Sequence, residues 1–401
     1  MSSPILQLAG APDAAAVAIA PRPRLLSLDV FRGFNILVMI VVNCCGAGSF
    51  TQLQHSAWNG CTLTDLVFPF FLFISGVSIA FSSRLQQEAS SAPARLRLVP
   101  SILRRAAIIF AIGLLINAFP YYRLATWRIP GVLQRIAICY LIGSLLYLFT
   151  SARTRWAVIA GLVVGYWVLM RFVPVPGFGV PTVDIPLLDP DRNLAAWLDR
   201  KLMMGHLYEK VRDPEGLLST LPALANMLFG IAAGEWIREL RSQTPCLDRS
   251  GAPCLLRRML RLGAACTVAG LLWSLEFPIN KKLWTSSYVL FTAGLAMITL
   301  AACYWLLDVK QLRGRWTVVP LVFGTNCIFA YALSEFLAIT LVVAKIHIDG
   351  QLMNLKNAFN YYTFDHIPWL QWSSLAYALF YTALCWAITW LLYRRRIFLK
   401  V

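Results

Sequence analysis

The chain has 401 residues, of which 58% are hydrophobic and 14% are charged. A water-soluble domain usually carries about 25% charged residues, and apolar segments long enough to cross a bilayer recur along the whole sequence. These features exclude a soluble protein and predict an all-α, polytopic integral membrane protein with about ten transmembrane helices. The net charge of +17 lies mainly in short loops between apolar segments, as in cytoplasmic loops, so we expect no nucleic-acid partner.

Each apolar segment is expected to form one membrane-spanning helix. Residues 1–23 lack the basic segment that opens a signal peptide, and we expect them to form a disordered cytoplasmic tail. Residues 24–401 are expected to form a single transmembrane domain. The expected spans are 30–48, 64–83, 102–119, 131–150, 156–173, 219–237, 258–276, 284–306, 318–343 and 370–393.

The basic residues predict the orientation of these spans, because Lys and Arg concentrate in short cytoplasmic loops. When both termini are placed in the cytoplasm, most of the Lys and Arg residues fall on the inner side. The four histidines, His55, His206, His347 and His366, then all lie in outer loops. We therefore expect any proton-transfer chemistry on the non-cytoplasmic side.

The longest outer loop, 174–218, begins with a proline-rich stretch and continues with a short amphipathic segment over 194–208. Structureless loops of this length are uncommon unless they have a function. The loop is either a lid over a substrate site or a cap without a chemical role, and its length favours neither.

The ten cysteines do not form a disulfide framework, since half of them lie inside apolar segments. The sequence contains no CxxC motif, so no zinc or iron–sulfur centre and no other metal site is expected. A disulfide among Cys44, Cys45 and Cys61, which flank the first outer loop, is left open.

Polar residues within the spans are candidates for function, because they are costly in a membrane. Asp29 and Arg32 lie at the inner mouth of the first span, where a local ion pair is the alternative interpretation. Arg135 lies about one turn into the fourth span and is expected to need a carboxylate or phosphate partner. Asn326 and Glu335 share the ninth span, and a hydrogen bond to another helix is the structural alternative for Glu335.

His55 lies in the first outer loop, where a lone histidine is usually a surface residue. Three neighbours favour a role in chemistry: Asp65 could orient the imidazole, Trp58 could cover it, and Asn43 could donate a hydrogen bond. A histidine held by a carboxylate is typical of a general base or an acyl-accepting nucleophile. A helix-capping role is the alternative for Asp65.

The sequence resembles the heparan-alpha-glucosaminide N-acetyltransferase family, including its bacterial membrane members, and more distantly other transmembrane sugar acyltransferases. The resemblance covers nearly the whole chain from about residue 24. It departs between Asn43 and His55, where the family's glycine run is missing. The matching segments are 24–33, 55–60, 65–69, 128–135, 206–208, 213–216, 280–284 and 393–398.

The resemblance implies that acetyl-CoA in the cytoplasm donates an acetyl group to a glucosamine-type amine on the outer side, in a homodimer of a bacterial inner membrane. It places His55, within HxxWNG, as the active histidine and gives it Asn43 and Asp65 as polar neighbours. Whether His55 acts as a base or carries the acetyl group is left open. Candidate coenzyme-binding residues are Arg32, Arg104, Arg105 and Arg135, with topogenic anchoring as the alternative for Arg104 and Arg105. Candidate acceptor-binding residues are Trp58, Asn59, His206, Asp213, Glu215, Asn280, Lys281 and Trp284.

Two other functions remain compatible with the residues. An amino-sugar or oligosaccharide transporter would suit the multiple spans and the intramembrane Glu335, although the inverted repeats frequent in transporters are not evident. A scaffold without catalytic activity would retain the fold but would not depend on His55.

Overall fold

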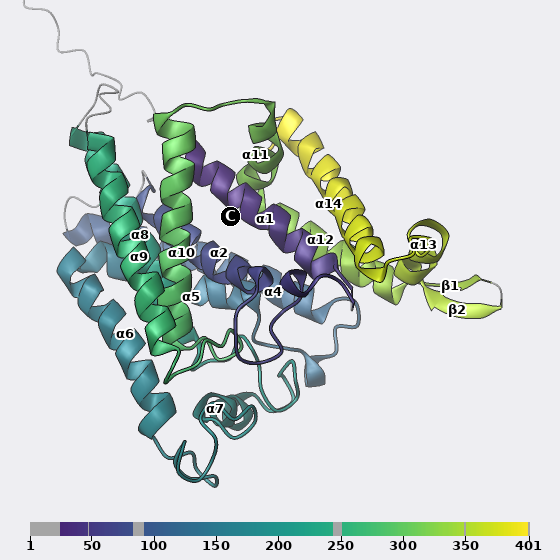
Figure 1. The fold of residues 1–401 in the computed structure, drawn as a ribbon, viewed down its shortest axis with the longest axis horizontal. Coiled ribbons are helices and arrows are strands. Elements are labelled where there is room, and N and C mark those ends of the chain that lie inside the picture. The colour runs from purple at the N-terminus through teal and green to yellow at the C-terminus, as the bar shows by residue number, and fades with distance from the viewer. Residues whose placement is uncertain (1–24, 47, 83–91, 244–250, 349, 400–401) are drawn as a thin grey trace, which may run out of the picture.

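The computed structural model describes residues 25–46, 48–82, 92–243, 251–348 and 350–399, so the tail expected over 1–23 lies outside the described residues. Helices dominate the described chain (Figure 1), which confirms the expected all-α class. The helices are α1 (Leu26–Cys44), α2 (Leu63–Ala80), α4 (Ala92–Ala118), α5 (Val132–Phe149), α6 (Ala152–Phe172), α7 (Leu194–Met203), α8 (Thr220–Gln243), α9 (Ala252–Trp273), α10 (Ser286–Tyr304), α11 (Val318–Thr325), α12 (Cys327–Val343), α13 (Leu355–Thr363) and α14 (Leu370–Arg394). One antiparallel hairpin, β1 (Lys345–Ile348) and β2 (Gln351–Asn354), follows α12.

Seven of the described helices are long and apolar enough to cross a membrane, and the bent pair of α11 and α12 makes eight if it counts as one span. We expected ten. The other two expected spans, 219–237 and 258–276, correspond to α8 and α9, which carry more polar residues. Helix α8 packs against α2, α5, α6 and α10, and a helix enclosed by others tolerates polar residues that lipid would not.

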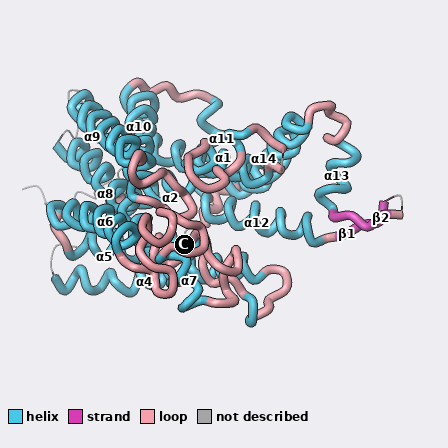
Figure 2. Tube along the Cα trace, turned by 60° about the horizontal axis from the view of Figure 1, so that its bottom comes forward, coloured by secondary structure: helices cyan, strands magenta, loops and turns pink. Residues whose placement is uncertain are grey.

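Helix α1 lies between two groups of helices (Figures 1 and 2). It packs on α2 and α10 on one side and on α11, α12 and α14 on the other. Its inner half contributes Phe31 to a core shared with α2, α8 and α10. Its outer half contributes Ile36 and Ile40 to a second core shared with α12 and α14. The position of α1 therefore decides how the two groups meet.

Two glycines allow α1 and α11 to approach backbone to backbone. A Cβ atom at Gly33 would lie 1.6 Å from the carbonyl oxygen of Pro320, and one at Gly324 would lie 2.0 Å from that of Asp29. Small residues permit such contacts between membrane helices. The glycines thus fix the crossing of α1 over α11.

The span expected as one helix over 318–343 is broken. Its two halves, α11 and α12, are bent by 78°, and Asn326 lies at the break with φ −126° and ψ 41°. The Asn326 side chain donates to the Ile397 carbonyl oxygen (3.1 Å) and accepts from the Leu399 backbone N–H (2.9 Å). These bonds attach the C-terminal segment at the bend, which explains why a polar residue occupies this place.

The outer loop expected over 174–218 is folded onto the bundle and contains α7 (Figure 2). Leu188 and Ala195 of this loop pack with Tyr166 of α6 and with Phe277 and Leu283 of the loop between α9 and α10. The described cysteines that flank the first outer loop are free thiols.

We expect Gly33→Ala to lower the melting temperature of the detergent-solubilised protein by several degrees, because overpacking typically costs about 1–3 kcal/mol. Gly161→Ala is the matched control, since a Cβ atom at Gly161, on α6, meets nothing within 4 Å. Thermal denaturation followed by size-exclusion chromatography measures both. Equal melting temperatures for the two variants would contradict the close approach of α1 and α11.

Candidate functional site

The site is built around the carboxylate of Asp65 in the first turn of α2. Thr62 precedes this helix and forms a capping box with Asp65. Atom Oδ2 of Asp65 accepts from the backbone N–H groups of Thr62 (3.0 Å) and Ser56 (3.1 Å) and from the Thr62 hydroxyl (3.0 Å). The other oxygen, Oδ1, lies 2.8 Å from Nδ1 of His55. Asp65 therefore caps the helix and holds the imidazole at the same time.

The burial of the two groups differs. The Asp65 side chain is 1% exposed, whereas that of His55 is 49% exposed. A carboxylate that accepts the Nδ1 proton fixes the tautomer whose other nitrogen, Nε2, is unprotonated. The imidazole can thus meet a ligand from outside with a nitrogen able to accept a proton or an acyl group.

Lys281, from the loop between α9 and α10, lies against the imidazole. Its Nζ is 2.9 Å from Nδ1 and 3.2 Å from Nε2 of His55, and 3.7 Å from Oδ1 of Asp65. Burial lowers the pKa of the Lys281 ammonium, and Asp65 and Glu215 offset part of this effect. The site therefore joins an acid, a base and a cation from distant parts of the sequence.

Short contacts bring the Lys281 loop to the His55 loop. The Gly60 backbone N–H donates to the Ile279 carbonyl oxygen at 2.7 Å, and Nδ2 of Asn280 donates to Oδ1 of Asn59 at 3.2 Å. Asn280 is fully buried and accepts from the Leu283 backbone N–H at 2.9 Å. Asn59 and Asn280, which we expected to contact an acceptor, thus bind each other.

Trp58 and Trp284 also have protein partners. The indole of Trp58 donates to the Leu188 carbonyl oxygen at 3.0 Å, so it faces the 174–218 loop. The indole of Trp284 is 1% exposed and donates to Oδ1 of Asn226 at 2.9 Å. Trp284 therefore belongs to the core.

A cavity of about 510 Å³ opens beside His55. Asn43 contributes to its wall but donates to Oε1 of Glu335 at 3.3 Å, whereas we expected it to serve the His55 loop. The residues that line the cavity include Ile40, Asn43, His55, Thr64, Ser334 and Glu335. Glu335 was not among the site residues that we expected. A carboxylate in the middle of an apolar span is the sequence feature that indicates it.

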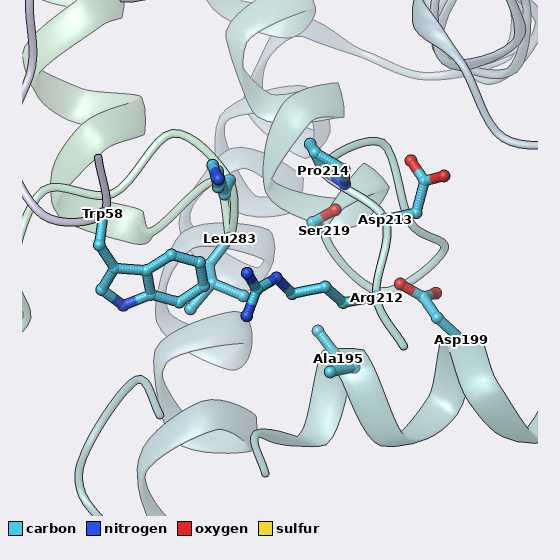
Figure 3. Close-up of a pocket in the computed structure, with 10 residues that line it drawn as sticks. Trp58, Ala195, Asp199, Arg212, Asp213, Pro214, Ser219 and Leu283 are labelled. Atoms are coloured by element: carbon cyan, nitrogen blue, oxygen red, sulfur yellow. The ribbon is translucent and has the colours of Figure 1, made fainter. Parts of the chain in front are cut away.

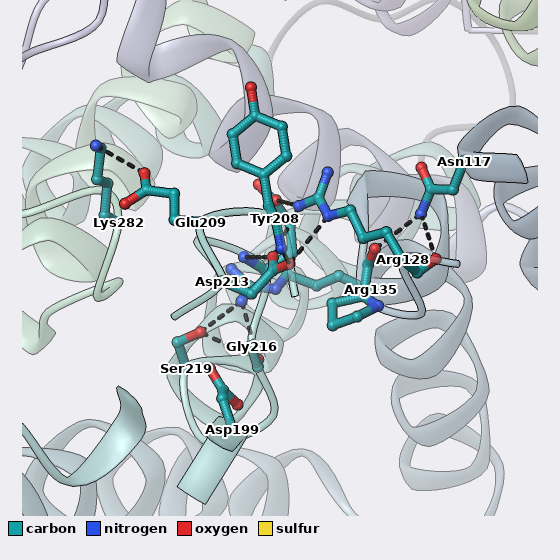
Figure 4. A network of polar contacts seen from close by, with 12 residues as sticks. Asn117, Arg128, Arg135, Asp199, Tyr208, Glu209, Asp213, Gly216, Ser219 and Lys282 are labelled. Atoms are coloured by element: carbon teal, nitrogen blue, oxygen red, sulfur yellow. Dashed lines mark hydrogen bonds and ion pairs between the residues drawn. The ribbon is translucent and has the colours of Figure 1, made fainter. Parts of the chain in front are cut away.

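Arg128 holds the outer loop through the two acidic residues that we expected to bind an acceptor. Its guanidinium contacts Asp213 at 2.9 and 2.7 Å and Glu215 at 2.5 Å (Figure 4). The Asp213 side chain is fully buried, and the ion pairs raise the pKa of the Arg128 guanidinium. Nδ1 of His206 lies 2.7 Å from the Trp127 carbonyl oxygen. Asp213, Glu215 and His206, which we expected to bind the acceptor sugar, thus make contacts within the protein that hold the loop.

Arg135, which we expected to need a carboxylate or phosphate partner, has no carboxylate within ion-pair distance among the described residues. It donates to the Ser219 hydroxyl (2.5 Å) and the Gly216 carbonyl oxygen (3.1 Å) (Figure 4). Its guanidinium lies 5.0 Å from the centre of the Trp284 ring. At 1% exposure it lies enclosed beneath the outer loop, away from the inner surface where we expected a coenzyme to bind.

The inner side carries the other arginines expected to bind a coenzyme. Arg32 donates to the Ser78 hydroxyl at 2.7 Å and pairs with Asp29 at 3.3 Å, so the local ion pair considered from sequence is present. Arg104 and Arg105 on α4 are exposed, and Arg105 lies 4.9 Å from the centre of the Tyr140 ring.

A second cleft lies under the outer loop, between Trp58 and α7 (Figure 3). Its volume is about 10 Å³, which is close to the space that one water molecule needs. Asp199 lines it and accepts from the Leu217 backbone N–H at 3.0 Å. The cleft is too small for a sugar, so the cavity at His55 is the better candidate for a ligand site.

The fold and the site define a class: a polytopic membrane protein with a His–Asp pair at the mouth of a cavity. The model of the family "Heparan-alpha-glucosaminide N-acetyltransferase, catalytic" matches residues 24–265. The chain is 31% identical over 371 residues to the heparan-alpha-glucosaminide N-acetyltransferase of Mus musculus, covering 78% of this chain and 54% of the relative. It is 30% identical over 443 aligned positions to that of Homo sapiens, covering 94% of this chain and 60% of the relative.

The chain belongs to the heparan-alpha-glucosaminide N-acetyltransferase family. It spans 54% and 60% of the length of the two curated relatives.

Asp199 gives the outer loop a pH-dependent stability. Burial raises the pKa of this carboxyl to about 6, whereas its unfolded value is about 3.9. The native state therefore holds the proton more tightly, and the free energy of unfolding falls as pH rises from about 4 to above 6. We expect Asp199→Asn to melt at a higher temperature than the wild type at about pH 7.5 and the difference to shrink at about pH 4.5. Thermal denaturation in detergent tests this.

Asp365→Asn is the control for this prediction, because Asp365 is exposed in an outer segment. We expect its melting temperature to follow that of the wild type at both pH values. A constant difference between Asp199→Asn and the wild type across the range would show that the Asp199 carboxyl is ionised throughout.

Proposed function

We propose that this protein transfers an acetyl group from cytoplasmic acetyl-CoA to the amine of a glucosamine-type sugar on the other side of the membrane. The observation that carries the proposal is the His55–Asp65 pair at a cavity of about 510 Å³, a volume typical of small-molecule sites. Family membership supports the reaction class, because both relatives are named as N-acetyltransferases. We also propose that the protein is a homodimer in a bacterial inner membrane and that its cavity faces the periplasm.

The reaction requires a base, because the amine must lose a proton as its nitrogen attacks the thioester carbonyl. In the direct route the N–C bond forms, the C–S bond breaks, and Nε2 of His55 takes the proton and passes it to the departing thiolate. In the stepwise route Nε2 attacks first, the C–S bond breaks and the thiolate leaves. The amine then attacks the acetyl group, the N–C bond to the imidazole breaks, and Nε2 takes the amine proton and passes it to the thiolate. Asp65 stays ionised in both routes and stabilises the positive imidazole.

The donor is proposed to bind at the inner surface, where coenzyme A would bring its phosphate groups to basic residues. Arg104 and Arg105 are exposed on α4 and are the first candidates for these contacts. Arg32 keeps one guanidinium nitrogen for Ser78 and another for Asp29, so its proposed role is secondary. Of the residues expected from the sequence to bind the acceptor sugar, we retain Lys281 as a candidate, because it contacts His55.

We expect His55→Ala to abolish acetyl transfer and to leave the folded protein intact, because this half-exposed side chain supports no core packing. The assay is the incorporation of labelled acetyl from acetyl-CoA into glucosamine and glucosamine-ended oligosaccharides. His347→Ala is the matched control, since His347 is exposed on β1, outside the cavity residues. Retained turnover in His55→Ala would remove His55 from the mechanism. Failure of the wild type to bind acetyl-CoA would favour the transporter.

We expect Asp65→Asn to lower turnover by roughly two orders of magnitude or more, because the amide cannot fix the tautomer or balance the imidazolium charge. The asparagine can still cap α2, so the variant should remain folded. Turnover and melting temperature are measured together. A wild-type rate would show that Asp65 is only a helix cap.

A further inference from the structure

Glu335 lines the same cavity as His55 and places an acidic group there. It lies on α12, about two turns beyond the bend at Asn326. Its neighbour Ser334 lines the same cavity, as do Asn43 and His55. Helix α12 packs on α1, and the bend turns α12 away from the direction of α11. The carboxyl therefore faces the space that the imidazole faces.

The contacts of Glu335 leave most of its capacity to accept hydrogen bonds unused. Its hydrogen bond comes from Nδ2 of Asn43 at 3.3 Å, which is long for a carboxylate. Within the described residues no Lys or Arg lies at ion-pair distance from it, whereas Asp65 has Lys281 at 3.7 Å. Burial without a nearby cation disfavours the charged form of this carboxyl. A positively charged ligand in the cavity would offset that cost and stabilise the carboxylate.

The titratable groups near Glu335 come from several elements. They are Cys44 and Cys45 at the end of α1, His55 of the outer loop, Tyr331 on α12 itself, Lys356 of α13 and Tyr381 of α14. The thiols and phenols are neutral near pH 7. His55 and Lys356 are the members of this set that can carry a positive charge, and Lys356 lies over the Tyr377 ring at 5.1 Å.

The proposed reaction requires two proton acceptors. An amino sugar in its ammonium form must lose one proton to become a nucleophile and a second proton during the attack. His55 can hold one proton at a time, and Asp65 is 1% exposed with both oxygens engaged. Glu335 lines the cavity and is the carboxyl group that can accept the first proton there.

We propose that Glu335 binds the ammonium group of the acceptor and takes its first proton, so that the amine reaches His55 neutral. This inference rests on the function proposed above. The step balances: the ammonium N–H bond breaks, the proton bonds to the Glu335 carboxylate, and a neutral amine and a neutral carboxyl result. His55 then takes the second proton as the N–C bond forms and the C–S bond breaks. The Glu335 proton leaves to water through the open cavity after the product departs.

The arrangement of charges favours this division of roles. Lys281 lies against His55 and would repel an incoming ammonium group, whereas Glu335 would attract it. An acceptor entering the cavity therefore meets the carboxylate as a cation and the imidazole as a neutral amine. The same charges select amines over hydroxyl groups, because a sugar hydroxyl gains nothing from an ion pair with Glu335.

Glu335→Gln is the test, because the amide oxygen can still accept from Asn43 while the charge and the proton acceptor are lost. We expect kcat/KM for glucosamine at about pH 6.5 to fall about ten-fold or more. The deficit should shrink towards about pH 9, where the free amine becomes abundant. Glu335→Asp should recover part of the loss.

Glu276→Gln is the matched control, because Glu276 has a 51% exposed side chain in an outer loop and does not line the cavity. We expect its pH profile to follow that of the wild type. A Glu335→Gln variant with wild-type kcat/KM at about pH 6.5, or with the same deficit at every pH, would overturn the role of Glu335. A wild-type protein that acetylates no amine would instead overturn the proposed function and this inference with it.

Discussion

The outer site depends on one buried carboxylate at the start of a helix. Oδ2 of Asp65 accepts three hydrogen bonds from the cap of α2 and the His55 loop, and the N-terminal end of the helix dipole favours its negative charge. Because Oδ2 is occupied in this way, Oδ1 is left to point at His55. The Asp65 carboxylate thus caps the start of α2 and orients the His55 imidazole at the same time.

The rest of the site is brought together by contacts between distant segments. Lys281 follows His55 by 226 residues, and the Gly60 to Ile279 hydrogen bond together with the Asn59–Asn280 pair places the two loops side by side. Arg128 fixes the outer loop through Asp213, whose side chain is fully buried. Hydrogen bonds between the two loops therefore bring Lys281 to His55, while ion pairs hold the outer loop in place.

The sequence allowed prediction of what is local. His55 and Asp65 are ten residues apart and flank a helix start, and the all-α class follows from the recurring apolar segments. The bend at Asn326 was missed because an apolar span without proline at that point resembles one straight helix. The partners of Asn43 and Arg135 were missed because each comes from a remote segment, Glu335 for one and Ser219 for the other.

Helix α1 links the inner and outer ends of the proposed reaction. Arg32 lies eleven residues before Asn43, which corresponds to about 16 Å along the helix, or roughly half of the apolar thickness of a bilayer. The bent pair of α11 and α12 follows α1 over this distance, since Arg32 contacts the Gly324 carbonyl oxygen and Asn43 contacts Glu335. The break at Asn326 falls between these two contacts. One wall of the bundle, built from α1 and the bent pair, therefore carries both Arg32 and the Glu335 side of the cavity.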